Sequence, residues 1–515
     1  MVMAMVVSRR ALPHAAEVVV RTVSKSLVAA IAVGSVSTQA GNWALEPSVS
    51  VTETVTNNAE LKQTNQKRES ITELSPGIRL RGEGDRVKLN FDFRLQKYLY
   101  AQDSSRNKGT KSLGTNGLVE LLDNWLFVDF DAIIAQQDIS AFGGSPTSDA
   151  NVNANRTETA NYRVSPYMRG QLGGWAAYQL RYRESLARAD SPQVADVNTG
   201  EWSAGLSSIS GGSFSWSLDG GGQQVKYKNG RSTQSEYIRA LLGYQPISQL
   251  KLSVFGGVER NDYASQEKER TSTPGVGFEW NPTERTRLAS SRQKRFFGNS
   301  TNVSFSHRTP LSVWQISNSK DISVVPNQFT IGKVSSTYDM YFQLFASIEP
   351  DPIKRAVLVN RFLVASGISP TGVVNGGFLT SRITVQHRRD VSVGLLGASN
   401  SITFSASQTE SRGLLAGANL PDDLSNNELI KQQSYAMQWS HQLSPLSSLS
   451  AMLMHQQSKG IGATPIETTT DGLSLLFSTQ LSPLTRALLS MRRTLVDGAS
   501  NYAESALTGT LSHQF

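Results

Sequence analysis

The last nine residues of the chain alternate in a way that constrains the fold more than any other feature. One face of an extended chain would carry Leu507, Gly509, Leu511, His513 and Phe515, while small polar residues occupy the other face. A strand that runs to the final residue and ends in an aromatic side chain is typical of outer-membrane β-barrels. Taken alone, these nine residues also fit an amphipathic edge strand of a soluble β-protein.

The same alternation recurs upstream, most clearly in residues 86–99, 433–443 and 473–481. The longer of these segments have about the length that a tilted transmembrane strand needs. Only 38% of the residues are hydrophobic and the mean hydropathy is −0.29, which suits a barrel because a barrel needs apolar residues only on its lipid face. The pattern predicts an all-β fold, a single antiparallel transmembrane β-barrel of about 16 strands, with roughly 14 to 18 acceptable and an even number preferred.

Two kinds of connection alternate between the predicted strands. Ser444-Pro445 and Ser482-Pro483 repeat one turn motif, and proline ends a strand because it fixes φ and lacks an N–H. Five longer polar stretches are predicted to be extracellular loops, namely 103–117, 145–157, 219–232, 413–427 and 457–470. Short periplasmic turns that alternate with long external loops are typical of a transmembrane barrel.

The N-terminal residues have the composition of an export signal. A basic stretch precedes the apolar segment 26–36, and Thr38-Gln39-Ala40 resembles a cleavage site, so we expect residues 1–40 to be a signal peptide and residues 41–515 to be the outer-membrane β-barrel. The chain contains no cysteine, which excludes disulfides and thiolate chemistry. The predicted location is the cell outer membrane, reached through the periplasm.

One segment departs from the strand pattern. Asp351 and Pro352 are suited to the start of a helix, and residues 353–365 are predicted to continue it. Such an apolar helix needs a cover. It would serve as a cap packed on the barrel end, as a plug of the lumen, or as a docking element for a partner.

Three stretches resemble the PEP-CTERM system-associated outer membrane protein family. They are Trp43–Thr54 (WALEPSVSVTET), Leu74–Arg86 (LSPGIRLRGEGDR) and the helix region 349–363 followed by Gly377–Arg382 (GFLTSR). The resemblance implies a Gram-negative outer-membrane barrel encoded near exopolysaccharide synthesis and exosortase genes. That family has no accepted functional residues, so none is carried over to this chain.

The residues give little support for catalysis or for a cofactor. The six histidines form no metal-binding spacing, and His441 and His513 are expected at the membrane interface. The nearest carboxylate pair, Asp422 and Asp423, is expected to be solvated in a loop. We therefore predict no catalytic, cofactor-binding or metal-binding residues, no enzyme activity and, with a net charge of only +8 and no dense basic run, no nucleic-acid partner.

The lumen is the remaining candidate for function. The basic residues expected to face it are Arg86, Lys88, Arg94, Lys251, Arg287 and Arg308. Such residues would attract an anionic solute or polymer, or they would pair with Asp92, Glu259, Glu279 and Glu284 and simply fill a polar interior.

The main hypothesis is a non-enzymatic outer-membrane barrel for cell-envelope export, associated with exopolysaccharide or the PEP-CTERM/exosortase system. A general or anion-preferring porin and an outer-membrane hydrolase are the alternatives. The expected partners are outer-membrane lipid, an exopolysaccharide or its export machinery, and the barrel-assembly machinery, which would recognise the C-terminal strand. Phe515 would then serve sorting and closure.

Overall fold

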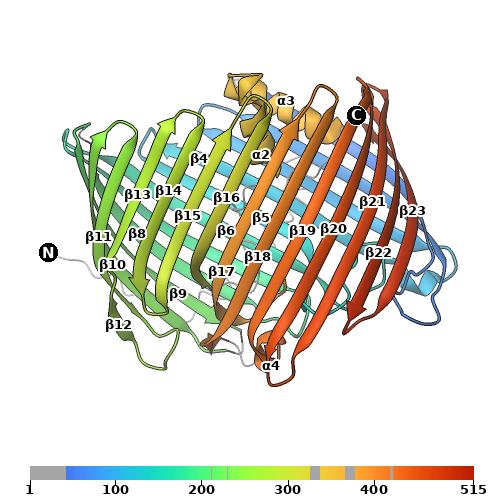
Figure 1. Cartoon of the computed structure of the whole chain (residues 1–515), viewed down its shortest axis with the longest axis horizontal. Helices are drawn as coiled ribbons and strands as arrows, with labels where there is room; N and C mark the ends of the chain where they lie inside the picture. Colours follow the sequence, from blue (N-terminus) through green and yellow to red (C-terminus); the bar gives the residue numbers. More distant parts are fainter. Residues whose placement is uncertain (1–41, 210, 229, 325–336, 366–376, 418–420) are drawn as a thin grey trace. The chain divides into compact units, whose positions relative to one another are not determined.

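The computed structural model describes residues 42–515 except 210, 229, 325–336, 366–376 and 418–420, and residues 43–515 form one compact unit (Figure 1). The predicted signal peptide, residues 1–40, lies outside the described residues. The strands are β1 (Asn42–Thr56), β2 (Glu69–Glu83), β3 (Val87–Tyr100), β4 (Lys108–Leu122), β5 (Leu126–Asp138), β6 (Arg156–Leu172), β7 (Ala176–Ala189), β8 (Val197–Ser208), β9 (Phe214–Tyr227), β10 (Thr233–Ile247), β11 (Leu250–Asn261), β12 (Glu269–Ser272), β13 (Gly275–Thr283), β14 (Thr286–Arg295), β15 (Gly298–Arg308), β16 (Ser312–Ser323), β17 (Arg382–Leu396), β18 (Asn400–Gly417), β19 (Asn427–Ser444), β20 (Ser447–Gly462), β21 (Ile466–Ser482), β22 (Thr485–Gly498) and β23 (Tyr502–Gln514). The helices are η1 (Ser104–Arg106), α2 (Thr337–Leu344), η2 (Phe345–Ser347), α3 (Pro352–Ala365) and α4 (Asp423–Asn426). Among the described residues, no helix is long and apolar enough to cross a membrane.

The strands form one antiparallel sheet that closes on itself. β1 pairs with β23 in a continuous register from Ser48↔Gln514 to Thr56↔Ala506. Of the 23 strands, β12 and β13 both pair with β11 and occupy the same place, interrupted near Pro274, so 22 strands surround the barrel. The predicted class, a closed antiparallel β-barrel with an even number of strands, is confirmed.

The predicted strand number of about 16, with a range of 14 to 18, is wrong. Three of the stretches expected to be loops consist largely of strand: residues 103–117 include most of β4, residues 219–232 continue β9, and residues 457–470 contain the end of β20 and the start of β21. The outward faces of β4 within 109–117 and of β9 beyond Leu218 are rich in Gly and small polar residues, so these parts lack the apolar alternation that predicts a transmembrane strand. Partners on both sides nevertheless hydrogen-bond them into the sheet.

The barrel has one apolar and one polar surface. Large apolar side chains on alternate residues, such as Leu453, Leu473 and Leu489, are exposed on the outside. Their neighbours in sequence point inward and are mostly hydroxyl, amide or charged groups. This arrangement matches the lipid face and the polar interior of a transmembrane barrel.

The two ends of the barrel differ. Turns of two or three residues join most successive strand pairs at one end, which we call the turn end, for example at residues 248–249, 284–285, 445–446 and 483–484. The start of β1 and the end of β23 lie at this same end, where Phe515 N–H donates to the Pro47 carbonyl at 2.9 Å. The opposite end, the loop end, carries the longer connections. By the usual orientation of such barrels, the turn end is periplasmic and the loop end extracellular.

Candidate functional site: the lumen and its two ends

Arginine–carboxylate pairs line a large part of the lumen wall. They face inward because they alternate with the outward apolar residues, and most join neighbouring strands. The pairs are Arg79–Asp92 (2.9 Å), Arg163–Asp131 (2.5 Å), Arg181–Asp129 (2.7 Å), Arg183–Glu201 (3.1 Å), Arg287–Glu279 (2.9 Å), Arg295–Glu259 (2.6 Å), Arg388–Asp390 (2.8 Å) and Arg492–Glu504 (3.0 Å). This charged arc gives the lumen fixed polar groups while most of its positive charge is compensated.

The remainder of the wall, from β18 through β23 to β1, is mainly uncharged, and the Arg492–Glu504 pair on β22 and β23 is an isolated exception near the loop end. Its inward residues are mostly Ser, Thr and Gln, and they hydrogen-bond one another across the strands. At the seam, Thr52 Oγ1 lies 2.9 Å from Thr510 Oγ1, and Thr54 Oγ1 lies 3.2 Å from Thr508 Oγ1. The lumen therefore has a charged arc and a hydroxyl arc.

The structure places the predicted basic residues at the lumen but does not bring them into one cluster. Lys88, Arg94, Lys251, Arg287 and Arg308 lie at inward positions of β3, β11, β14 and β15, and Arg86 lies in the turn before β3. All but Arg94 are within two residues of a strand end at the turn end. The common feature of these five residues, Arg94 excepted, is their position at the periplasmic rim.

The interpretation that the six predicted basic residues pair with carboxylates holds for four of them. Arg287 pairs with Glu279, as predicted, and Arg94 lies 3.9 Å from Asp92. Arg86 and Lys88 pair with partners that were not predicted, Asp123 at 2.5 Å and Glu83 at 3.0 Å. Within the described part of the chain, Lys251 and Arg308 have no ion-pair partner.

Helices α2 and α3 lie inside the turn end of the barrel (Figure 1). Met340, Tyr341, Leu344, Val359 and Leu363 are buried in one cluster with Val313, an inward residue of β16. The Tyr341 hydroxyl lies 2.9 Å from Thr403 Oγ1 on the inward face of β18. Gly394 of β17 provides room for Met340 beside Val313, because a Cβ there would lie 3.2 Å from the Val313 side chain and 3.3 Å from that of Met340.

This placement answers how the apolar helix predicted at 351–365 is covered. The helix runs from Pro352 to Ala365, and Asp351 Oδ1 accepts a hydrogen bond from the Lys354 N–H. Helix α2 and η2 cover one side of it, and α2 in turn packs on β16 and β17. This seat lies at the opposite end of the barrel from Ser323 and Arg382, the strand ends that bound the insertion. A cavity of about 600 Å³ lies between the helices and β17–β20, so the helices fill the lumen only in part. Another cavity, of about 620 Å³, lies on the outer face of the barrel.

At the loop end, three connections are fastened together. Asp423, at the start of α4, accepts hydrogen bonds from Ser140 Oγ (2.8 Å) and the Ala141 N–H (2.6 Å). Asp422 accepts from Thr380 Oγ1 (2.6 Å) and Arg382 Nε (3.1 Å). The expectation that these adjacent acids are solvated is wrong for both, because each holds a neighbouring loop. Burial raises the pKa of Asp423 above its ordinary value.

The connection between β5 and β6 is held over the lumen by the wall itself. Its Asn151 Nδ2 donates to Glu504 Oε1 at 2.8 Å, and Glu504 also receives Thr56 Oγ1 (2.9 Å) and Arg492. The Tyr100 hydroxyl donates to the Ala150 carbonyl at 2.6 Å. Both ends of the lumen thus contain chain segments in specific contact with the wall.

The histidines do not form a site in the lumen. His441 and His513 lie on the outward face near the turn end, as expected, and His455 is outward and bonded to Asp471. In the described ranges, no group of three or more His, Asp or Glu is placed to hold a metal ion.

Sequence reasoning missed Arg163, Arg181 and Arg295, which carry much of the charged arc, and Arg492, which pairs with Glu504 on the other side of the lumen. In the sequence they could have been found as Lys88 and Arg94 were, because they alternate along their strands with the outward apolar residues. Their partners depend on strand register, which the sequence does not contain in readable form.

No family model matches the chain, and no curated protein matches it in sequence. Solved structures similar to it include the siderophore receptor PirA from Acinetobacter baumannii, at 8% identity and a TM-score of 0.49, with 93% of this chain and 81% of that chain covered. The FrpB iron transporter from Neisseria meningitidis is 8% identical with a TM-score of 0.48, covering 91% of this chain and 82% of that chain. The ferric enterobactin receptor PfeA from Pseudomonas aeruginosa (G324V mutant) is 10% identical with a TM-score of 0.44, covering 93% and 81%.

The location follows from the barrel itself. A closed sheet of 22 strands leaves no backbone edge unpaired, and its outward apolar band can face lipid. The protein is an outer-membrane β-barrel.

Proposed function

We propose that this barrel is a non-enzymatic channel for cell-envelope export and that its cargo is an exopolysaccharide. The observation that carries the proposal is the seat of α2 and α3 inside the turn end of a 22-strand barrel. A general porin needs an open, water-filled lumen, whereas barrels of 22 strands hold internal segments. A wide lumen with an internal element suits a large cargo whose passage is controlled.

The lumen wall is chemically suited to a hydrated polymer. Its hydroxyl arc offers donors and acceptors to sugar hydroxyls, and its charged arc offers compensated ion pairs. The resemblance to the PEP-CTERM system-associated outer membrane protein family supports the same cargo, and we propose that the chain belongs to that family. The proposed partners are outer-membrane lipid, the export machinery at the turn end and the barrel-assembly machinery at the C-terminal strand.

Loss of polysaccharide secretion in a deletion strain tests the proposal. We expect secreted polysaccharide to fall several-fold and to return when the wild-type gene is supplied. Normal secretion in the deletion strain would overturn the export function. Planar-bilayer recordings of the purified barrel should show a mostly closed channel.

An anion-preferring porin is a second candidate, favoured by the unpaired Lys251 and Arg308 at the periplasmic rim. It predicts a large, steady conductance whose anion preference falls in the Lys251→Gln/Arg308→Gln double variant, with Lys97→Gln, which faces outward, as control. A channel of that kind would replace the export proposal.

The hydrolase alternative has less support. It requires a nucleophile beside a base that a carboxylate orients. Among the described residues, His387 and His455 lie beside Glu410 and Asp471, and neither is hydrogen-bonded to a serine or threonine hydroxyl. The histidines that bond a threonine hydroxyl, His307 and His513, have no carboxylate partner in the same ranges.

A further inference from the structure

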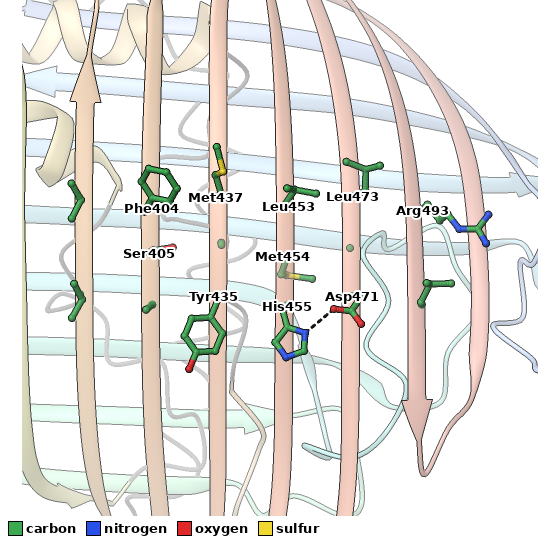
Figure 2. Close-up of a pocket in the computed structure, with 16 residues that line it drawn as sticks. Phe404, Ser405, Tyr435, Met437, Leu453, Met454, His455, Asp471, Leu473 and Arg493 are labelled. Carbon is green, nitrogen blue, oxygen red and sulfur yellow. Dashed lines mark hydrogen bonds and ion pairs between the residues drawn. The ribbon is translucent and has the colours of Figure 1, made fainter.

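A groove of about 620 Å³ lies on the outer surface of the barrel, over β17 to β22 (Figure 2). Its volume is in the range of small-molecule sites in proteins. Its outward lining is almost entirely apolar and includes Phe404, Ala406, Met437, Leu453 and Leu473. The groove faces the membrane, so lipid is the medium that fills it.

The loop-side margin of the groove is polar. His455 Nδ1 lies 2.7 Å from Asp471 Oδ1, and Tyr435 stacks on the His455 ring with centroids 6.2 Å apart (Figure 2). These three residues are opposite one another on β19, β20 and β21, since Tyr435 pairs with His455 and His455 with Asp471. They form one row across three neighbouring strands.

This row marks the edge of the apolar band. On β20 the outward residues change from Leu449, Ala451 and Leu453 to His455, Gln457 and Lys459. On β21 they change from Leu475 and Leu473 to Asp471, Thr469 and Glu467 in the same direction. Aromatic and polar residues at such an edge lie at the level of lipid headgroups, here those of the outer leaflet.

Arg493 supplies a cation beside this row, one outward position nearer the turn end than Leu495, which is opposite Asp471. It lies at an outward position of β22, opposite Leu473, and lines the groove. Its closest polar contact is weak, 3.5 Å from Nη1 to Ser505 Oγ, and across the described residues it has no carboxylate partner. Asp471, the nearest acid in the groove lining, is already engaged by His455. An exposed, uncompensated arginine above an apolar groove is complementary to a phosphate above an acyl chain.

We propose that this groove is a binding site for a phosphorylated, acylated glycolipid of the outer leaflet. An acyl chain lies along Phe404, Met437, Leu453 and Leu473, and the lipid phosphate pairs with Arg493. Because Nδ1 of His455 is held by Asp471, Nε2 is the ring nitrogen directed to the headgroup. The proposal is independent of the cargo of the lumen.

Lipid binding to the purified full-length barrel in detergent tests the proposal by native mass spectrometry. The probes are hexa-acylated bisphosphoryl lipid A and its fully dephosphorylated form. Arg493→Gln should weaken binding of the bisphosphoryl probe by about tenfold, the value of one charge-assisted contact, and leave the dephosphorylated probe unaffected. Ala406→Trp, which fills the groove, should weaken both.

Arg292→Gln is the matched control, because Arg292 also lies at an outward position, on β14 opposite Val276, away from the groove. Equal binding by wild type and Arg493→Gln, or equal loss in Arg292→Gln, would overturn the proposal. So would a dimer that Ala406→Trp disrupts, since a second chain would then occupy the groove. Release of fatty acid from the probe, abolished by His455→Asn, would replace binding with hydrolysis.

Discussion

Glu60 shows how single charges hold the loop end together. It lies in the connection between β1 and β2, its side chain is 7% exposed, and it pairs with Lys62, Arg106 and Lys67. Hydrogen bonds from Lys62, then Arg106 and Lys67, lower the pKa of Glu60 from 4.5 to about 2. A carboxyl group whose pKa is lowered by folding stabilises the folded loop at pH values above its unfolded pKa. The loop loses this stabilisation as the pH falls through the folded pKa.

We therefore expect residues 57–68 to become susceptible to pepsin as the pH falls from about 4.5 to about 2. Glu60→Gln should already be cut at pH 4, whereas Glu83→Gln, at the turn end, should behave as wild type. Cleavage sites and rates are read by mass spectrometry. Equal cleavage of wild type and Glu60→Gln at every pH would contradict the role given to this carboxylate.

The pKa of Asp423 is shifted in the opposite direction from that of Glu60. Burial raises its pKa, with the hydrogen bonds from Ala141 and Ser140 only partly offsetting this effect. A carboxyl group whose pKa is raised by folding stabilises the folded state at pH values below its unfolded pKa of 3.8. The folded state loses this stabilisation as the pH rises through the folded pKa. Hydrogen exchange at residues 139–143, corrected for intrinsic rate, should be slower at pH 4 than at pH 7. The Asp423→Asn variant should lose this difference, and equal protection of wild type at both pH values would refute the argument.

At the scale of the element, α3 is the segment whose removal from its seat has the clearest consequence. Leu363 is fully buried in the cluster that α2 and α3 form with Val313 of the lumen wall. Leu363→Glu therefore places an unpaired charge in an apolar cluster, which costs several kcal/mol. We expect the helices to leave their seat and the single-channel conductance to rise several-fold. Lys354→Ala, on an exposed position of the same helix, should not change it. A folded, heat-modifiable Leu363→Glu barrel with unchanged conductance would show that α2 and α3 do not obstruct the lumen.

The elements also show what the sequence can predict. Strands such as β3 and β19 are recognisable because their outward face is apolar, and α3 because its apolar spacing and its Asp351-Pro352 start are local signals. Residues 108–117 of β4 and 219–227 of β9 are not recognisable as strands, because glycine and polar residues replace the apolar alternation there. Their membership depends on hydrogen bonds to neighbouring strands, which no local pattern encodes.

The lumen site was predictable to the same extent. Parity places Lys88, Lys251 and Arg287 on the inward face correctly. The expected partner Glu259 on β11 instead binds Arg295 on β14, two places further around the barrel. Because a one-residue slip moves every side chain to the other face, pairing can be derived only once the register is known.

For the whole molecule, the decisive feature is that the terminal strand closes the barrel on the first. The alternation that ends at Phe515 has its inward threonines opposite those of β1, with Thr52 directly across from Thr510. Directly opposed residues of an antiparallel pair have Cα atoms about 4.5–5.5 Å apart, within reach of a disulfide. The chain has no cysteine, so an introduced pair has no competing thiols.

We expect the Thr52→Cys/Thr510→Cys variant to form a disulfide in most molecules after mild oxidation of the folded barrel. The link turns the chain into a covalent ring, so the heated, unreduced protein should migrate differently from the reduced one on a denaturing gel. Thr52→Cys/Leu511→Cys is the matched control, because Leu511 faces outward and opposes Val51 instead. Efficient cross-linking in the control, or none in the opposed pair of a heat-modifiable barrel, would mean that β1 and β23 do not meet in this register. Cross-linking confined to the opposed pair would establish that the strand ending at Phe515 closes the lumen.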